Sequence, residues 1–193
     1  MPGTRVAAWM LTFWAVAAGP GGGDALAREP QAAVPATGTI EYAFSPGDDV
    51  ATLVVRAIDD ARAQVLVQAF TFTHDRIAEA LLRAGRRGVD VRVLLDREQT
   101  ELLDRDAVRA LAAAGFPVLL DGEHLAAHNK VLVIDATGPD PVVVTGSFNF
   151  TFAAQYRNAE NLLVLRGNPA LAGAYRDNWE KHGAHSKPMA GKP

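Results

Sequence analysis

Two apolar segments place the strongest constraint on the fold of this chain. Val65–Phe70 and Val131–Ile134 consist almost entirely of apolar residues. Successive side chains of a β-strand point to opposite faces, so strands of this composition are apolar on both faces. They have to be covered on both sides, which is typical of inner strands of a sheet that lies between layers of helices.

Strand and helix patterns alternate over residues 39–182, and 193 residues are enough for one domain with a sizeable core. We predict an α/β fold in which a mixed β-sheet is sandwiched between helices. The expected strands are 40–44, 65–72, 89–96, 117–120, 131–135, 142–145 and 161–166, with a hairpin turn over 136–141. The expected helices run from about 50 to 62, from 75 to 86, to an end near 114, and from 168 to about 181.

The first 27 residues differ from the rest of the chain. Arg5 precedes a short apolar run over 6–18, and small residues follow up to Ala27. This pattern predicts a secretory signal peptide over 1–27, cleaved after Ala27 or, as the second choice, after Ala18. An uncleaved anchor is the alternative, although the run is shorter than the roughly 20 residues of a membrane span. We therefore expect an exported protein, periplasmic or secreted.

The remaining boundaries follow from composition. Residues 28–38 are rich in proline and alanine and lack periodicity, which predicts a flexible linker, and residues 183–193 are expected to form a disordered tail. The catalytic domain is expected over 39–182.

Composition limits the chemistry. The chain has no cysteine, which excludes disulfides and thiolate metal sites, and its five histidines are scattered without a metal-binding spacing. We therefore expect neither a metal site nor a cofactor. The formal net charge of −3 gives no sign of a nucleic-acid-binding protein, but it leaves a local basic cleft possible.

His128 and Lys130 are the first candidate catalytic residues. They are two positions apart on an expected buried strand, so their side chains should project to one face. A lone histidine more often has a structural role, but lysine is almost never fully buried without a partner. Burying both is expensive unless they meet each other or a ligand.

Four further polar residues accompany this pair. Ser147 and Asn149 are expected to share one face of a second strand and to supply neutral donors to phosphoryl oxygens, although both types also occur in turns. Asp135 has the opposite parity to His128, so a structural or orienting role is expected. Glu160 is either an ordinary exposed glutamate or the carboxylate that orients the imidazole.

These residues resemble the HKD motif of the phospholipase D superfamily. The resemblance is to its small single-motif members, notably the bacterial Nuc-type endonucleases, and extends from about Thr39 to Trp179. Three blocks carry it in the family's order: His128-x-Lys130-x4-Asp135, Gly146-Ser147-x-Asn149-Phe150-Thr151 and Arg157-Asn158-Ala159-Glu160-Asn161.

The resemblance implies a phospholipase D/nuclease-like fold and metal-independent hydrolysis of phosphodiesters through a phosphohistidine. His128 would attack phosphorus, Lys130, Ser147 and Asn149 would hold the non-bridging oxygens, and Glu160 would orient the imidazole. A second histidine has to protonate the leaving group.

The complete pattern His-x-Lys-x4-Asp occurs once in the chain, because His185-Ser186-Lys187 is not followed by the aspartate, and a single motif predicts a homodimer in which each copy contributes its residues to one shared site. The other histidines are not expected to serve. His124 is expected in a loop, His74 in the first turn of a helix, and His182 and His185 at or beyond the last helix.

Three functions are considered, and the small size and the single motif favour the first, an endonuclease. A non-specific endonuclease would bind DNA or RNA along a basic rim, for which Arg97, Arg105 and Arg157 are candidates. A phospholipase D would use an exposed apolar rim, to which Phe148, Phe150 and Phe152 could contribute, although packing under the site is expected of them. An inactive binding module of the same fold is disfavoured because His128 and Lys130 are both present.

Overall fold

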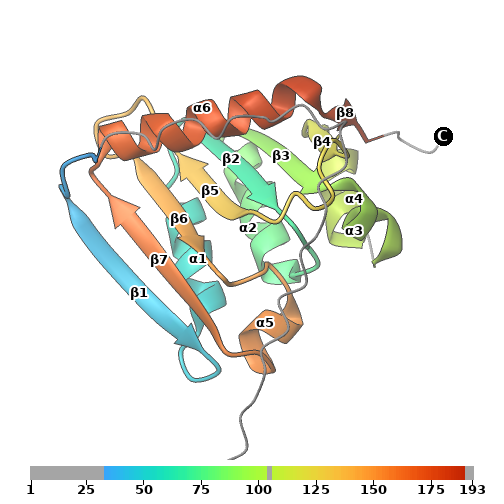
Figure 1. Cartoon of the computed structure of the whole chain (residues 1–193), viewed down its shortest axis with the longest axis horizontal. Coiled ribbons are helices and arrows are strands. Elements are labelled where there is room, and N and C mark those ends of the chain that lie inside the picture. The colour runs from blue at the N-terminus through green and yellow to red at the C-terminus, as the bar shows by residue number, and fades with distance from the viewer. Residues whose placement is uncertain (1–32, 104–105, 190–193) are drawn as a thin grey trace, which may run out of the picture. The chain divides into compact units, whose positions relative to one another are not determined.

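The computed structural model describes residues 33–103 and 106–189 and contains a single mixed sheet (Figure 1). Its strands are β1 (Thr39–Ser45), β2 (Gln64–Ala69), β3 (Asp90–Asp96), β4 (Val118–Asp121), β5 (Lys130–Ile134), β6 (Val142–Gly146), β7 (Glu160–Arg166) and β8 (Lys187–Pro188). Its helices are α1 (Val50–Asp59), α2 (Asp75–Arg86), α3 (Arg97–Leu102), α4 (Asp106–Ala113), α5 (Phe152–Tyr156) and α6 (Pro169–His185).

The strand order is β1-β7-β6-β5-β2-β3-β4-β8. β2, β3 and β4 pair in parallel, whereas the other neighbours are antiparallel, including the predicted β5–β6 hairpin. Helix α6 crosses one face of the sheet, and α1 and α2 lie on the other (Figure 1). The predicted mixed sheet between helices is therefore confirmed.

The two apolar segments fill both cores, as their composition predicted. Val65 and Val67 of β2 pack with α1 and α2, whereas Leu66 packs with Trp179 of α6. β5 divides in the same way, with Leu132 and Ile134 on the α1/α2 side and Val131 and Val133 on the α6 side. These central strands form a rigid base for the loops at their ends.

Helix α1 ends earlier than predicted. Asp49 caps its start by accepting a hydrogen bond from the Thr52 amide, but the helix stops at Asp59 rather than near residue 62. The amides of Arg62, Ala63 and Gln64 donate instead to the carboxylate of Asp135, at 2.7–2.8 Å. A tertiary contact that the local sequence does not reveal thus competes with the last turn of the helix.

The prediction of a disordered tail over 183–193 is wrong up to residue 189. Helix α6 continues to His185, β8 pairs with β4, and the Met189 amide donates to the Val118 carbonyl at 2.8 Å. The physical reason is that the end of α6 packs over β4, where His182 Nδ1 lies 3.0 Å from the carboxylate of Asp121. Residues 190–193 lie outside the described part of the chain.

The predicted linker has tertiary hydrogen bonds in its described part. Thr37 donates to the carbonyl of Gly167, and the side chain of Asn168 donates to the carbonyl of Pro35. The predicted signal peptide, residues 1–27, lies outside the described residues. Among the described residues, no helix has the length and apolar character needed to cross a membrane.

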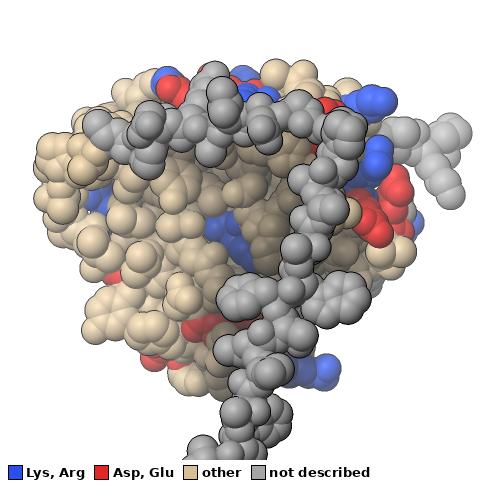
Figure 2. Space-filling view, in the orientation of Figure 1, with Lys and Arg blue, Asp and Glu red and all other residues tan. Residues whose placement is uncertain are grey.

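An exposed apolar strip runs along β1 and the neighbouring part of β7. The side chains of the strip are large, apolar and exposed, and they belong to Ile40, Tyr42, Phe44 and Leu163. The exposed fraction is 68% for Tyr42 and 55% for Phe44. Tyr42 and Leu163 are directly paired across the two strands, so they share a face. The surface over β1 and β7 carries few charged side chains (Figure 2). Apolar surface of this kind is typical of a contact area.

His74 is the buried titratable residue of the α1/α2 side. It stands at the N-cap position of α2, is only 6% exposed, and neither of its ring nitrogens has a hydrogen-bond partner. Burial, aided by the positive charge of Arg76, lowers its pKa below the usual 6.5.

We therefore expect acid to destabilise the fold through His74. Below about pH 6.5 the unfolded chain takes up a proton that the folded chain resists, so the free energy of unfolding falls. Urea unfolding at pH 7.5 and 5.5 should show a decline that is larger in the wild type than in His74→Leu, by up to about 1.4 kcal/mol. Equal declines in the two proteins would contradict this role.

Candidate active site

Three strand ends meet at one edge of the sheet. β5 begins at Lys130, β6 ends at Gly146, and β7 begins at Glu160. Because β6 lies between β5 and β7 in antiparallel register, the start of β5, the end of β6 and the start of β7 are neighbours. The sheet therefore brings together the three sequence blocks that carry the candidate residues.

His128 and Lys130 contact each other, although not as two residues of one buried strand. β5 begins only at Lys130, so His128 lies just before the strand and is exposed, whereas Lys130 is 6% exposed. Lys130 Nζ lies 3.0 Å from His128 Nδ1 and donates to the His128 carbonyl at 2.8 Å. The ammonium group of Lys130 thus contacts both the ring and the backbone of the exposed His128.

Two contacts hold the segment that carries His128. The buried carboxylate of Asp96, at the end of β3, accepts a hydrogen bond from the Ala127 amide at 2.8 Å. The Phe70 amide donates to the Asn129 carbonyl at 2.7 Å, and the Phe70 ring lies 4.3 Å from the imidazole. The imidazole is therefore exposed on one side and packed against an aromatic ring on the other.

The charge of Lys130 is held in a partly desolvated place. Burial lowers the pKa of Lys130 below its usual value, and the negative charge of Glu160 opposes that shift. The ring of Phe70 also faces the ammonium group, at 4.9 Å from its centroid. A cation with so little water around it interacts strongly with an anion that enters the site.

Glu160 contacts Ser147 rather than His128, so the expectation that it hydrogen-bonds the imidazole is wrong within one chain. Ser147 Oγ donates to Glu160 Oε2 at 2.6 Å, and Asn158 donates to Oε1 at 3.0 Å. The Asn161 amide in turn donates to Ser147 Oγ at 3.0 Å. Glu160 therefore fixes the serine hydroxyl and lies close enough to stabilise the charge of Lys130.

Ser147 and Asn149 follow β6 instead of lying on it, which corrects their predicted place on a strand. The chain leaves the strand at Gly146, where a Cβ atom would collide with the backbone carbonyl of Asn161. Beyond this close contact, the side-chain oxygen of Asn149 is buried without a hydrogen-bond partner. This oxygen only accepts hydrogen bonds, so it is available to a donor group, whereas a phosphoryl oxygen would have to be held by the NH2 group of Asn149.

Asp135 lies at the opposite end of β5 from His128, and its carboxylate accepts the three backbone bonds that end α1. Its backbone adopts the left-handed conformation, with φ of 50°. The position of Asp135 therefore gives it a structural role, as its parity on the strand indicated.

The proposed rim residues fall in different places. Phe148 and Phe150 are fully buried under the site, whereas Phe152 is exposed on α5, a helix that the sequence analysis did not predict. The Arg157 guanidinium lies 5.9 Å from the Phe152 ring centroid. Arg97 is exposed and lies over Gly122, and Arg105 is outside the described residues.

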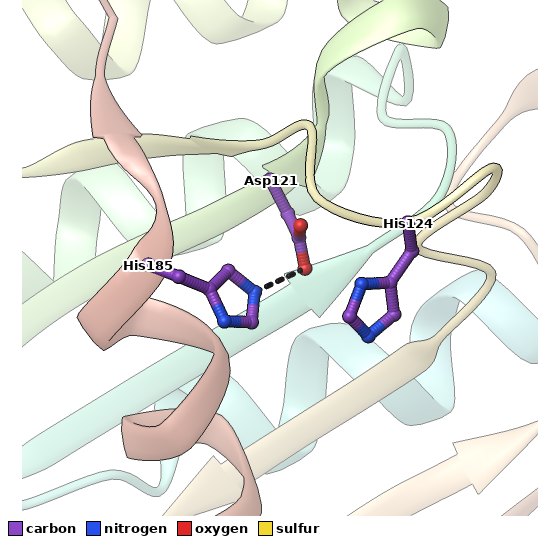
Figure 3. A group of neighbouring side chains, drawn as sticks. All are labelled: Asp121, His124 and His185. Atoms are coloured by element: carbon purple, nitrogen blue, oxygen red, sulfur yellow. Dashed lines mark ion pairs between the residues drawn. The ribbon is translucent and has the colours of Figure 1, made fainter. Parts of the chain in front are cut away.

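A second polar cluster was missed by sequence reasoning. Asp121 at the end of β4 is surrounded by His124 from the following loop and by His182 and His185 from α6 (Figure 3). Three histidines that are scattered in the sequence are therefore neighbours in the structure. Nothing in their spacing could have found this group, because only the packing of α6 over β4 assembles it.

The arrangement at the three strand ends suits chemistry on an anion. It combines an exposed imidazole, a buried cation and two small polar groups, which together can bind and attack a phosphoryl centre. The other described histidines lie elsewhere, His74 at the start of α2 and the rest around Asp121. One copy therefore offers a single imidazole to this chemistry.

Comparisons with known proteins agree with this geometry. Residues 54–182 match a family model described as cardiolipin synthase, PLD-like domain. A protein named phospholipase D from Rickettsia conorii is 36% identical over 140 residues, which cover 72% of this chain and 67% of that protein. A mitochondrial cardiolipin hydrolase from Chlamydomonas reinhardtii is 29% identical over 144 residues, covering 73% of this chain and 60% of that protein.

The fold is similar to that of a solved structure as well. Nuc from Salmonella typhimurium, described as a phospholipase D family member, has a TM-score of 0.72 and 31% identity. The match covers 79% of this chain and 99% of that one.

Replacing Asp135 should separate stability from chemistry. In Asp135→Ala three backbone donors lose their acceptor and alanine is forced into the left-handed region, so we expect a loss of about 2–4 kcal/mol in the free energy of unfolding. Asp135→Asn keeps one acceptor oxygen and tolerates that backbone, so its loss should be about 1 kcal/mol. Urea unfolding measures both. A fully stable Asp135→Asn protein without turnover would instead place Asp135 in the chemistry.

Proposed function

The chain belongs to the phospholipase D superfamily of phosphodiester hydrolases, and from that premise we propose that it is a metal-independent, non-specific endonuclease that cleaves DNA or RNA. The contact between the buried Lys130 ammonium and the exposed His128 imidazole carries the proposal. It places a fixed positive charge beside a nucleophile, and the described residues need no metal ion to supply that charge.

The proton of a neutral His128 imidazole can lie on either ring nitrogen. When the charged Lys130 donates to Nδ1, the proton is on Nε2, and when Nδ1 carries the proton, Nε2 keeps a free lone pair that can attack phosphorus. A leaving alkoxide takes its proton from an imidazolium ion, which becomes neutral as it gives the proton up. One imidazole cannot be the neutral nucleophile and the imidazolium acid in one step.

Two copies of the chain solve this difficulty. In the proposed homodimer, Nε2 of one neutral His128 attacks phosphorus while the imidazolium of the second copy's His128 gives a proton to the leaving oxygen and becomes neutral. The second histidine then takes a proton from water, which hydrolyses the phosphohistidine. Lys130, Ser147 and Asn149 of both copies would hold the non-bridging oxygens as negative charge builds up.

The exposed apolar strip is our candidate for the dimer contact. Phe44 of the strip pairs with Asn161, and the Asn161 amide donates to Ser147 in the site. The strip thus leads directly to the candidate active site. A two-fold axis beside it would place the strips of two copies against each other and bring their two sites together.

An exposed aromatic pair and a neighbouring arginine favour nucleic acid as the substrate. The exposed rings of Phe152 and Tyr156 are 4.4 Å apart, and Arg157 lies beside them. Aromatic rings interleaved with arginine are typical of surfaces on which the bases of a single strand stack. The resemblance to single-motif endonucleases points the same way.

Lipid cleavage is the second candidate. The relatives from Rickettsia and Chlamydomonas are named for phospholipid substrates. Leu125, three positions before His128, is 99% exposed and could enter a membrane surface together with the exposed rings of α5.

One assay distinguishes these functions. The full chain is given plasmid DNA, single-stranded RNA and phosphatidylcholine vesicles in EDTA, with circular dichroism as the check that it stays folded. We expect nucleic-acid cleavage without choline release, and a loss of at least about 10⁴-fold in His128→Ala. Choline release alone would favour the phospholipase, and activity that needs added metal in a folded protein would refute the proposed chemistry.

The dimer has its own test. Tyr42→Glu combined with Phe44→Glu should convert a dimer into a monomer in sedimentation analysis and lower turnover by at least about 100-fold, because charges would be buried in the contact. Leu102→Glu combined with Leu103→Glu adds the same two charges at other exposed apolar residues, so it is the matched control and should alter neither property. An active wild-type monomer would rule out the shared site.

A further inference from the structure

We propose that Asp121, His124 and His185 form a binding site for one divalent transition-metal ion of the zinc class. Each residue offers one ligand atom, and these atoms all lie within 4.8 Å of one another. The three come from different elements, namely the end of β4, the loop after it and the last residue of α6 (Figure 3).

The carboxylate of Asp121 is the centre of the site. Its side chain is fully buried, and Oδ2 lies 3.0 Å from His182 Nδ1 and 3.3 Å from His185 Nε2. Figure 3 shows the rings of His124 and His185 on either side of this carboxylate. A buried carboxylate that several imidazoles face is the kind of ligand set that zinc takes in proteins.

Hydrogen bonding alone does not account for the cluster. The Nε2 atom of His185 is buried, and although it lies near Asp121 it makes no hydrogen bond of acceptable geometry. The three imidazole rings are only 5.0–5.4 Å apart between centroids, so protonated rings would repel one another. Neutral imidazoles with an unused nitrogen are what a metal ion requires.

Small side-chain movements would complete the site. Zinc binds nitrogen and oxygen at about 2.0–2.2 Å, so tetrahedral ligands lie roughly 3.3–3.6 Å apart, and the present spacing has to shorten by at most about 1.5 Å. His124 can supply this movement because its loop is exposed. His182, already hydrogen-bonded to Asp121, would orient the carboxylate, and water would take the fourth position.

The ion would connect the end of α6 to the loop that precedes His128. His124 lies four positions before His128. The site is separate from the residues assigned to phosphodiester cleavage, so its role is to hold that loop and the C-terminal segment in place. It is independent of the proposed function, and an inactive variant can be used to test it.

The test is a zinc titration of the full chain, carrying no polyhistidine tag, by isothermal calorimetry and by thermal unfolding. We expect one ion per chain and a Tm about 5–10 °C higher, at a hundredfold excess of zinc over its Kd, than in EDTA. His124→Ala and His185→Ala should each weaken binding by about 100-fold or more, and His182→Ala by about 10–100-fold.

His128→Ala is the matched control, since it removes a histidine of the same loop that is not a ligand, and it should bind zinc as the wild type does. Because His124 is exposed, His124→Ala should keep the Tm of the wild type in EDTA, which separates lost binding from lost folding. The proposal is overturned if zinc does not bind, if binding survives both ligand substitutions, or if it depends on His128.

Discussion

Burial of the Lys130 ammonium is the constraint on which the candidate site depends. An apolar strand that begins with a lysine only 6% exposed is stable only if other groups compensate the charge. Glu160 supplies a negative charge, Phe70 supplies a ring face, and His128 supplies its carbonyl oxygen and a ring nitrogen. None of these removes the charge, so the ammonium remains strongly attractive to an anion. The residues that make the lysine tolerable are therefore also those that surround the place where a phosphodiester would lie.

Two carboxylates position the backbone around this site. Asp96 holds the Ala127 amide and so fixes the segment that carries His128. Asp135 binds three successive amides at the other end of β5 and so fixes the turn between α1 and β2. Both carboxylates satisfy donors that the helices and strands leave unpaired, and neither faces the imidazole. Asp135, the aspartate of the sequence motif, thus supports the fold. The candidate catalytic residues come instead from neighbouring strand ends.

Two features of the molecule point beyond a single site in a single chain. The exposed apolar strip on β1 and β7 leads toward Ser147 and suits contact with a second copy, which would supply the second imidazole. The histidines around Asp121 lie near the other end of the strand order, far from β1, where β4 meets the end of α6. The strip concerns how the sites of two copies combine, and the histidine cluster concerns how the loop before His128 is held.

The sequence by itself determined the mixed sheet between helices, because strands as apolar as Val65–Phe70 have to be covered on both faces. Its motif also provided His128, Lys130, Ser147, Asn149 and Glu160 as candidate site residues, since so many polar groups beside apolar strands need a shared purpose. Only the tertiary structure decided how they pair, because Glu160 meets Ser147 through the pairing of β6 with β7, which the spacing of these residues does not reveal. It alone ordered residues 183–189 and gathered the histidines around Asp121, since both depend on where α6 packs, and local spacing carries no information about contacts between distant elements.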